Sequence, residues 1–77
     1  LKELNLNDNK ILKVGKNISN LKKLEVLYLN FNNILIFTKE ICDLKELKQL
    51  YIENNKIEKL PNEISNLINL EIMLLYN

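Results

Sequence analysis

The sequence lacks most of the residue types from which small functional sites are built. Its 77 residues include no histidine, tryptophan, arginine or alanine, and only one each of cysteine, glycine, proline and methionine. One cysteine, Cys42, cannot form an internal disulfide, and without histidine or a CxxC pair no zinc-binding pattern is present. The lack of arginine removes the bidentate fork for phosphate. The single glycine, Gly15, excludes a glycine-rich phosphate loop.

Charge and hydrophobic runs narrow the class of protein further. Eleven lysines against ten acidic residues give a net charge of +1, so no bulk field favours nucleic acid or anionic lipid. The longest apolar runs, among them residues 34–37, have only four or five residues and are too short for a membrane span. The chain has no initiator methionine and no signal-like start, and its first residue already belongs to a repeated pattern. We therefore expect a fragment of a longer protein that is cytoplasmic, or extracellular if the full chain carries a signal peptide.

What the sequence does contain is periodic. LKELNLNDNKI begins at residue 1, LEVLYLNFNNI at 24, LKQLYIENNKI at 47 and LEIMLLYN at 70, so the offset is 23 residues each time. In this frame positions 1, 4, 6, 11, 14, 18 and 21 are apolar in every full copy, with a chance probability on the order of 10⁻⁷. The chain therefore reads as one domain of repeats 1–23, 24–46 and 47–69 with a partial repeat 70–77.

The motif LxxLxLxxNxI and the segment LPNEISNL at residues 60–67 resemble the leucine-rich repeat. The form is the 23-residue LxxLxLxxNxIxxLPxxIxxLxx type, similar to intracellular Ras-group and bacterial arrays. The resemblance implies an α/β solenoid, a horseshoe segment with a parallel β-sheet on the concave face and short 3-10 or helical turns on the convex face. Gly15 and Thr38 stand where Pro61 stands, so two of the three turns lack the stiffening proline.

Positions 4 and 6 alternate as an inward-facing strand requires, which places positions 3, 5 and 7 toward solvent. The expected strands cover residues 3–6, 26–29, 49–52 and 72–75, and the expected helical turns cover 16–20, 39–43 and 62–66. Position 9 is always asparagine, and we predict that this column is structural: a buried amide can satisfy backbone groups of the turn and reach the next copy. The column consists of Asn9, Asn32 and Asn55.

The ends of the array have no polar capping repeat. Each repeat buries its apolar face only against its neighbours, so inward residues of the first and last copies are left uncovered. These residues are Leu1, Leu4, Leu6, Leu70, Met73 and Leu75. We expect either missing flanking segments or self-association through the uncapped ends.

Groups for catalysis are scarce. Ser19, Cys42 and Ser65 share position 19 of successive repeats, which indicates a packing slot for a small side chain, and no histidine is present to activate them or Thr38. We therefore expect no enzyme, cofactor or metal.

The charge of the expected strand face argues against nucleic-acid binding. This face is formed by positions 2, 3, 5, 7 and 8 and carries five acidic residues and two lysines. Because its net charge of −3 repels phosphate, we expect no nucleic acid. These charged residues are Glu3, Asp8, Glu25, Glu53, Glu71, Lys2 and Lys48.

The same face carries an apolar and aromatic patch that grows toward the last copy. Contiguous exposed apolar surface with tyrosine usually marks a binding site for another protein. The alternative is that neighbouring side chains, Tyr28 and Tyr51 above all, simply pack on one another along the ladder. The patch consists of Val26, Tyr28, Phe31, Tyr51, Ile72, Leu74 and Tyr76.

The function predicted from the sequence is a non-catalytic protein–protein interaction module that binds a protein partner on the concave strand face. The resemblance implies a scaffold or regulator in signalling, or a recognition element between host and microbe. The alternative is a recognition segment of a larger multidomain enzyme or receptor. The complete reading frame would separate the two.

Overall fold

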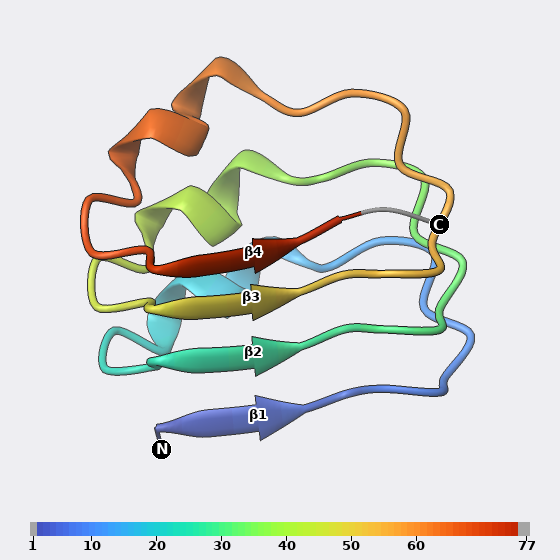
Figure 1. Ribbon diagram of the computed structural model, residues 1–77, viewed down its shortest axis with the longest axis horizontal. Coiled ribbons are helices and arrows are strands. Elements are labelled where there is room, and N and C mark those ends of the chain that lie inside the picture. Colours follow the sequence, from blue (N-terminus) through green and yellow to red (C-terminus); the bar gives the residue numbers. More distant parts are fainter. Residues whose placement is uncertain (1, 76–77) are drawn as a thin grey trace.

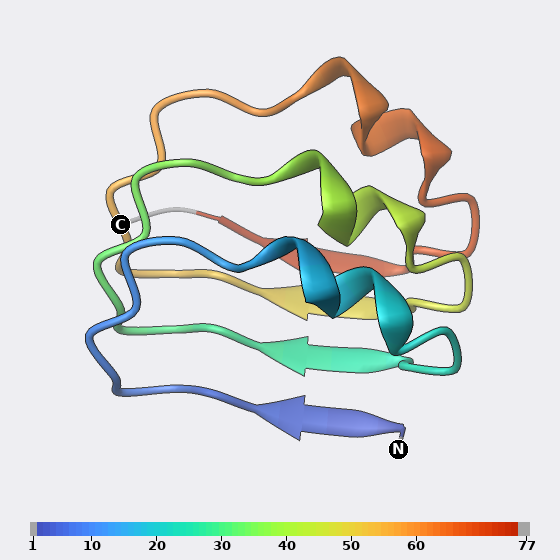
Figure 2. The same ribbon diagram turned by 180° about the vertical axis from the view of Figure 1, so that it is seen from behind.

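The computed structural model describes residues 2–75. Four short parallel strands form one sheet in sequence order, and three 3-10 helices return the chain to the start of the next strand (Figure 1). The strands are β1 (Glu3–Asn5), β2 (Val26–Tyr28), β3 (Gln49–Tyr51) and β4 (Ile72–Leu74). The helices are η1 (Lys16–Asn20), η2 (Lys39–Asp43) and η3 (Asn62–Asn66). Figure 2 shows the helices stacked along the side opposite the sheet, which confirms the predicted α/β solenoid architecture.

The strands pair with a constant offset of 23 residues. Leu4 lies opposite Leu27, and Leu27 lies opposite Leu50, so the middle residue of each strand points into the coil. The strands end one residue earlier than predicted, although the amide of the next residue still bonds across the sheet, as Leu6 N does to Tyr28 O at 2.8 Å. They end early because the chain turns sharply at position 8, where Asp8 has a φ of 59°.

The three helices cover the residues that the sequence predicted, and each begins in the same way. Gly15, Thr38 and Pro61 precede them with φ angles of −69°, −74° and −72°. Their carbonyl oxygens accept the first bond of the turn, as Gly15 O does from Ile18 N at 3.2 Å. The three positions therefore share the conformation to which proline is restricted.

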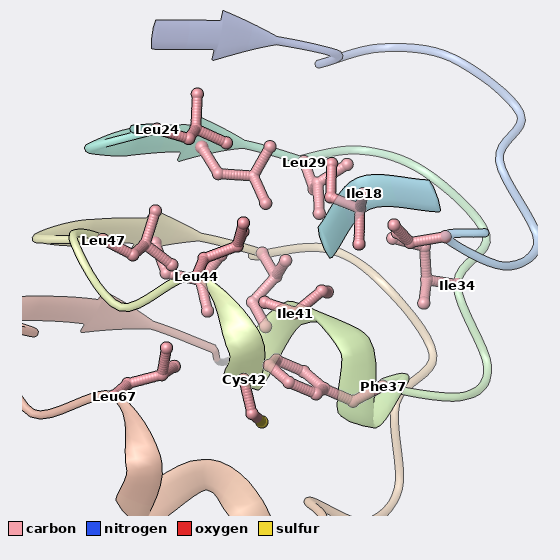
Figure 3. Packing of buried hydrophobic residues seen from close by; sticks show 14 residues of the cluster. Ile18, Leu24, Leu29, Ile34, Phe37, Ile41, Cys42, Leu44, Leu47 and Leu67 are labelled. Carbon is pink, nitrogen blue, oxygen red and sulfur yellow. The ribbon is translucent and has the colours of Figure 1, made fainter. Parts of the chain in front are cut away.

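The core lies between the sheet and the helices and is densest in the two middle repeats (Figure 3). The largest fully buried side chains are Leu24, Leu27, Leu29, Ile34, Ile41, Leu44, Leu47, Leu50, Ile52 and Cys42. Leu4 and Leu6 in the first repeat, and Leu70, Met73 and Leu75 in the last, are only partly buried. Leu1, also expected at an uncovered end, lies outside the described residues. Among residues 2–75, no helix has the length and apolar character to cross a membrane.

Candidate functional site

The centre of the strand face is a stacked pair of tyrosines. Tyr28 and Tyr51 lie opposite one another on β2 and β3, and their rings are nearly parallel, with centroids 4.9 Å apart and planes 8° apart. The Tyr51 hydroxyl donates a 2.7 Å hydrogen bond to Gln49 Oε1 on the same strand. Both tyrosines are half-buried. The ladder packing anticipated as an alternative is therefore present, and it makes the two rings a fixed aromatic surface.

The remaining strand residues of the patch extend this pair into two rows. The register places Val26, Gln49 and Ile72 in one row and Tyr28, Tyr51 and Leu74 in the next. Ile72 is 38% exposed, and Val26 and Leu74 are half-buried. Tyr76, the last member of the predicted patch, lies outside the described residues. The structure thus brings five of the seven predicted residues together on strands β2 to β4.

Phe31 lies just beyond the end of β2, and its backbone is strained. Its φ of 58° lies in the left-handed region, which aspartate and asparagine tolerate better than bulky residues do. The equivalent positions in the neighbouring repeats hold Asp8 and Asn54, at φ 59° each. The Phe31 side chain is 55% exposed, so packing into the core does not explain the choice of residue. A bulky aromatic held in a strained backbone at the surface is typical of a functional position.

The charged residues on this face fall into two groups: position 2, where the charges cancel, and the other positions, where every charged residue is acidic. Position 2 alternates in sign through Lys2, Glu25, Lys48 and Glu71, and Lys48 Nζ lies 3.7 Å from Glu25 Oε1. The acidic residues outside this column are Glu3, Asp8 and Glu53. No lysine occupies positions 3, 5, 7 or 8 in any repeat. The net negative charge therefore belongs to the part of the face that carries the aromatic residues.

The column at position 9 forms hydrogen bonds between repeats. The Asn32 amide donates to Leu6 O at 2.9 Å, and its Oδ1 accepts from Ile11 N at 3.1 Å. Asn55 repeats this pattern one repeat later, with Leu29 O at 2.8 Å and Ile34 N at 3.0 Å. Both asparagines are 6% exposed. The amides reach the preceding copy, not the next one as expected, because the side chain points back into the turn below it.

Asn9 differs from the other two members of the column. It is exposed, and among residues 2–75 its amide donates only within its own turn, to Leu6 O at 3.0 Å and Asn7 O at 3.1 Å. Within the described chain no repeat precedes it to supply the backbone groups that Asn32 and Asn55 bind. The expectation that Asn9 is buried is therefore wrong for this structure.

A second asparagine column was missed by the sequence reasoning. Position 7 was assigned to the open face, yet Asn30 Oδ1 accepts from Glu53 N at 2.7 Å, and Asn7 Oδ1 accepts from Asn30 N at 2.7 Å. These bonds reach forward into the next repeat. The sequence signal was present, since position 7 reads Asn in two successive repeats. Asn30 is therefore a structural residue and not a free surface side chain.

Cys42 has the surroundings of a packing residue. It is fully buried in η2, and burial raises the pKa of its thiol, with Glu63 and Asp43 adding to the effect. A thiol with a raised pKa is a poor nucleophile. Among residues 2–75, no group of three or more histidine, cysteine or acidic side chains is placed to hold a metal ion.

A second apolar area, not anticipated, lies between the strands and the helices. Leu12, Leu35 and Ile36 are 63%, 55% and 61% exposed. A bridge between Lys13 and Ile36 joins the first two repeats there, and within the described residues the next pair of repeats has no such bridge. A hollow of about 320 Å³ opens at that point, lined by residues 35–37 and 58–61. The four-residue apolar run at 34–37 was the sequence signal for it.

The comparisons with known proteins place this geometry in a family. The family model for the leucine-rich repeat matches residues 1–57, and the chain belongs to that family. None of the curated proteins matches the chain. Because leucine-rich-repeat domains generally bind proteins, the family and fold indicate a protein-interaction module; the fold is generally a non-enzymatic scaffold.

Two solved structures show the same fold. A leucine-rich-repeat protein of Leptospira interrogans is 39% identical over 94% of this chain, with a TM-score of 0.90. An internalin of Listeria monocytogenes is 24% identical over 87% of this chain, with a TM-score of 0.76. The chain spans only 18% and 19% of the lengths of those two proteins.

Proposed function

We propose that this chain is a non-catalytic module that binds a protein partner on its strand face, in a scaffold or regulatory role. The observation that carries the proposal is the aromatic surface built on Tyr28 and Tyr51 and extended by Val26, Ile72 and Leu74. These side chains point away from the core, so the fold does not need them to close the coil. Tyrosine, with an apolar ring and a polar tip, is a preferred anchor at such interfaces.

Phe31 supports the proposal independently. Its exposed ring and left-handed backbone carry a cost in stability that its neighbours Asp8 and Asn54 avoid. Contact between the Phe31 ring and a partner would explain why a residue that lowers stability is present at this position. Phe31 lies beside the tyrosine surface, three residues after Tyr28 and just beyond the end of β2. Its amide N bonds to Glu53 O of the neighbouring repeat at 3.0 Å, which holds it next to the chain that follows Tyr51.

The test is a binding titration with the partner that the intact protein captures. The double variant Tyr28→Ala, Tyr51→Ala removes the centre of the surface, and truncating such an anchor typically costs about 2 kcal/mol or more of binding free energy. Neither ring lies in the core, so the variant should keep the circular dichroism spectrum of the wild type.

The matched control changes charge on the opposite side of the coil. Lys13, Lys16 and Lys39 are exposed on the returning segments, and replacing all three with serine should alter salt dependence or association rate at most. If the lysine variant loses binding and the tyrosine variant keeps it, the strand-face model is wrong and an electrostatic contact on the outer side replaces it.

The alternative function is a recognition segment within a larger multidomain enzyme or receptor. The short share of the two similar proteins that this chain covers, 18% and 19%, supports considering it. In that case binding on the strand face is retained, and any catalytic activity lies in another part of the polypeptide. The complete reading frame decides between the two.

A further inference from the structure

We propose that the segment bound on the strand face is basic, and that one of its arginine side chains stacks on the open face of Tyr28. The inference rests on the proposed function and specifies the chemistry of the partner. It depends on two independent features of this face: an aromatic ring with one free side, and acidic residues that form no salt bridge among residues 2–75.

The free side of the ring follows from the strand register. Tyr28 lies between Asn5 on β1 and Tyr51 on β3, and Tyr51 covers one face of its ring. The other face is directed toward Asn5, whose Oδ1 accepts a 2.9 Å hydrogen bond from Asn7 N on its own strand end. Asn5 is exposed and too short to cover a phenol ring. A space is therefore left beside the Tyr28 ring on the side of β1. Tyr51 has no such space, because it lies between Tyr28 and Leu74.

The charge around this space is net negative, because Glu3, Asp8 and Glu53 outnumber Lys2, which directly precedes Glu3 in the chain. Glu3 lies on the same side of β1 two residues before Asn5, roughly 7 Å along the strand, and Asp8 follows at the end of the same turn. Both are exposed. Within the part of the chain that the structure describes, the one salt bridge joins Lys48 and Glu25, so neither Glu3 nor Asp8 is paired. Glu53, two residues after Tyr51 in the third repeat, adds a third carboxylate.

The lysines of the chain lie elsewhere. Nine of the eleven lysines occupy positions outside the strand face, and the other two belong to the alternating column at position 2. The aromatic part of the face therefore has three carboxylates and no cation of its own. An acidic surface of this kind attracts a positively charged segment and repels an acidic one.

Arginine fits the space better than lysine does. Its guanidinium is planar, so it can lie parallel to the Tyr28 ring as a third layer in the stack while its N–H groups reach carboxylates at the edge. Lysine can provide the charge without the plane. The partner is accordingly expected to carry an arginine next to apolar residues that contact Val26 and Tyr51.

The experiment titrates the intact protein with a defined probe and follows the tyrosine ring signals by NMR. The probe is an eight-residue, end-blocked peptide of alternating arginine and valine. Its control is the same peptide with citrulline in place of arginine, which keeps the shape and removes the charge. The arginine peptide should bind about tenfold more tightly, with larger shifts at Tyr28 than at Tyr51, and the difference should shrink as salt is raised.

Matched variants separate the local site from general attraction. Glu3→Gln with Asp8→Asn should weaken binding of the arginine peptide about fivefold and leave the fold intact, because both positions are exposed and asparagine tolerates the backbone at position 8. Glu46→Gln with Glu63→Gln removes the same charge outside the strand face, from the turn before β3 and from η3, and should leave binding unchanged. Tyr28→Leu should reduce affinity as much as the first pair does.

Equal affinity for the arginine and citrulline peptides would overturn the inference, and so would equal losses in the two pairs of charge variants. If the natural partner is lost by Tyr28→Ala, Tyr51→Ala but retained at full affinity by Glu3→Gln, Asp8→Asn, the proposed function stands and the basic partner does not. If the natural partner is retained by the tyrosine variant, the proposed function fails as well.

Discussion

The side-chain amide of Asn32 donates a hydrogen bond to the carbonyl oxygen of Leu6, 2.9 Å away in the preceding repeat. The same side chain accepts from Ile11 N and donates to Leu29 O and Asn30 O. One buried amide thus satisfies four backbone groups in two repeats. The burial of these groups, more than any intrinsic preference of asparagine, explains why the residue recurs at position 9.

The first prediction concerns stability at this position. Asn32→Leu leaves buried backbone groups without partners, each at a cost of roughly 1–3 kcal/mol, so the free energy of unfolding should fall by several kcal/mol. Asn9→Leu should cost less than about 1 kcal/mol, because Asn9 is exposed and water can replace its bonds. Thermal melts of the two variants test the difference, and equal losses would contradict the assigned roles.

Asn30→Leu provides an intermediate case within the same experiment. Its Oδ1 accepts one bond across repeats, from Glu53 N, and the residue is half-buried. The loss should be about 1 kcal/mol or slightly more, between the other two variants. The solvent-facing position that the sequence analysis gave to residue 7 of each repeat would have made this change mild.

Proline at the two turns that lack it should stabilise the fold. Gly15 and Thr38 already have φ near −70°, and a Cβ added at Gly15 meets nothing within 4 Å. Replacing Thr38 also removes a buried hydroxyl that, within the described residues, has no hydrogen-bond partner. Gly15→Pro and Thr38→Pro should each add about 0.4–1 kcal/mol, chiefly by restricting the unfolded chain. Denaturant melts measure the gain.

The control for the proline variants is a position whose amide is used. Asn33→Pro removes the 2.9 Å bond from Asn33 N to Ile11 O and should destabilise the fold. If Gly15→Pro destabilises as much as Asn33→Pro does, the shared turn conformation is not the one described.

Phe31→Asn should stabilise the fold and weaken partner binding. Asparagine tolerates the left-handed backbone at this position, and relief of the strain should add about 0.5–1 kcal/mol. Loss of the exposed ring removes an anchor at the border of the tyrosine surface. A melt and a titration on the same variant measure the two effects. The reverse change one repeat later, Asn54→Phe, should destabilise by a similar amount; a stable Asn54→Phe variant would show that the turn does not strain phenylalanine.

Stability should decrease at alkaline pH through Cys42. Burial, with Glu63 and Asp43 nearby, raises the thiol pKa in the folded chain, so the folded state keeps a proton that the unfolded state releases. The stabilisation that the protonated thiol gives the folded state is complete below the thiol pKa of the unfolded chain, about 8.5. It is lost as pH rises toward the thiol pKa of the folded chain. Melts at neutral and alkaline pH should show this loss in the wild type and less of it in Cys42→Ser.

Serine at position 42 is a suitable control for packing. Ser19 and Ser65, in the same position of the neighbouring repeats, donate to the carbonyl oxygens of Lys16 and Asn62, three residues earlier. A serine at 42 has the equivalent carbonyl of Lys39 within the same kind of turn. The variant should therefore fold, and an unchanged pH slope would rule out the thiol as its cause.

Self-association of the 77-residue chain is the last prediction. Strands β1 and β4 each pair on one side only among the described residues, and Leu4, Leu6, Leu70 and Met73 are only partly buried. Open edges and partly covered leucines favour contact between copies. Sedimentation across a range of concentrations should show a rising average mass. A monomer at every concentration would indicate that the terminal repeats cover themselves.

The sequence predicted the period, the strands and the helical turns because each depends on local alternation and on the recurrence of Leu and Ile. It could not show which neighbouring repeat an amide reaches, so the position 9 column was expected to bind the next copy. It also could not show that Asn30, assigned to the open face, accepts a hydrogen bond from Glu53 N. The left-handed backbone at position 8 was also not predicted: Asp8 and Asn54 are residue types that favour it, but Phe31 is not. The hollow beside Pro61 depends on how far two loops separate, which only the packed structure determines.

Between repeats, the hydrogen bonds of the asparagines at positions 7 and 9 span 21, 23 or 26 residues, whichever pair of repeats they join. Insertion or deletion of one whole 23-residue unit would therefore recreate this pattern of bonds, whereas a single inserted residue would shift the partners of every bond that spans the insertion. Such a chain can change its length by duplication and widen its binding surface by one strand at a time. The stacked tyrosines at the same position of two successive repeats have the arrangement that such copying would produce.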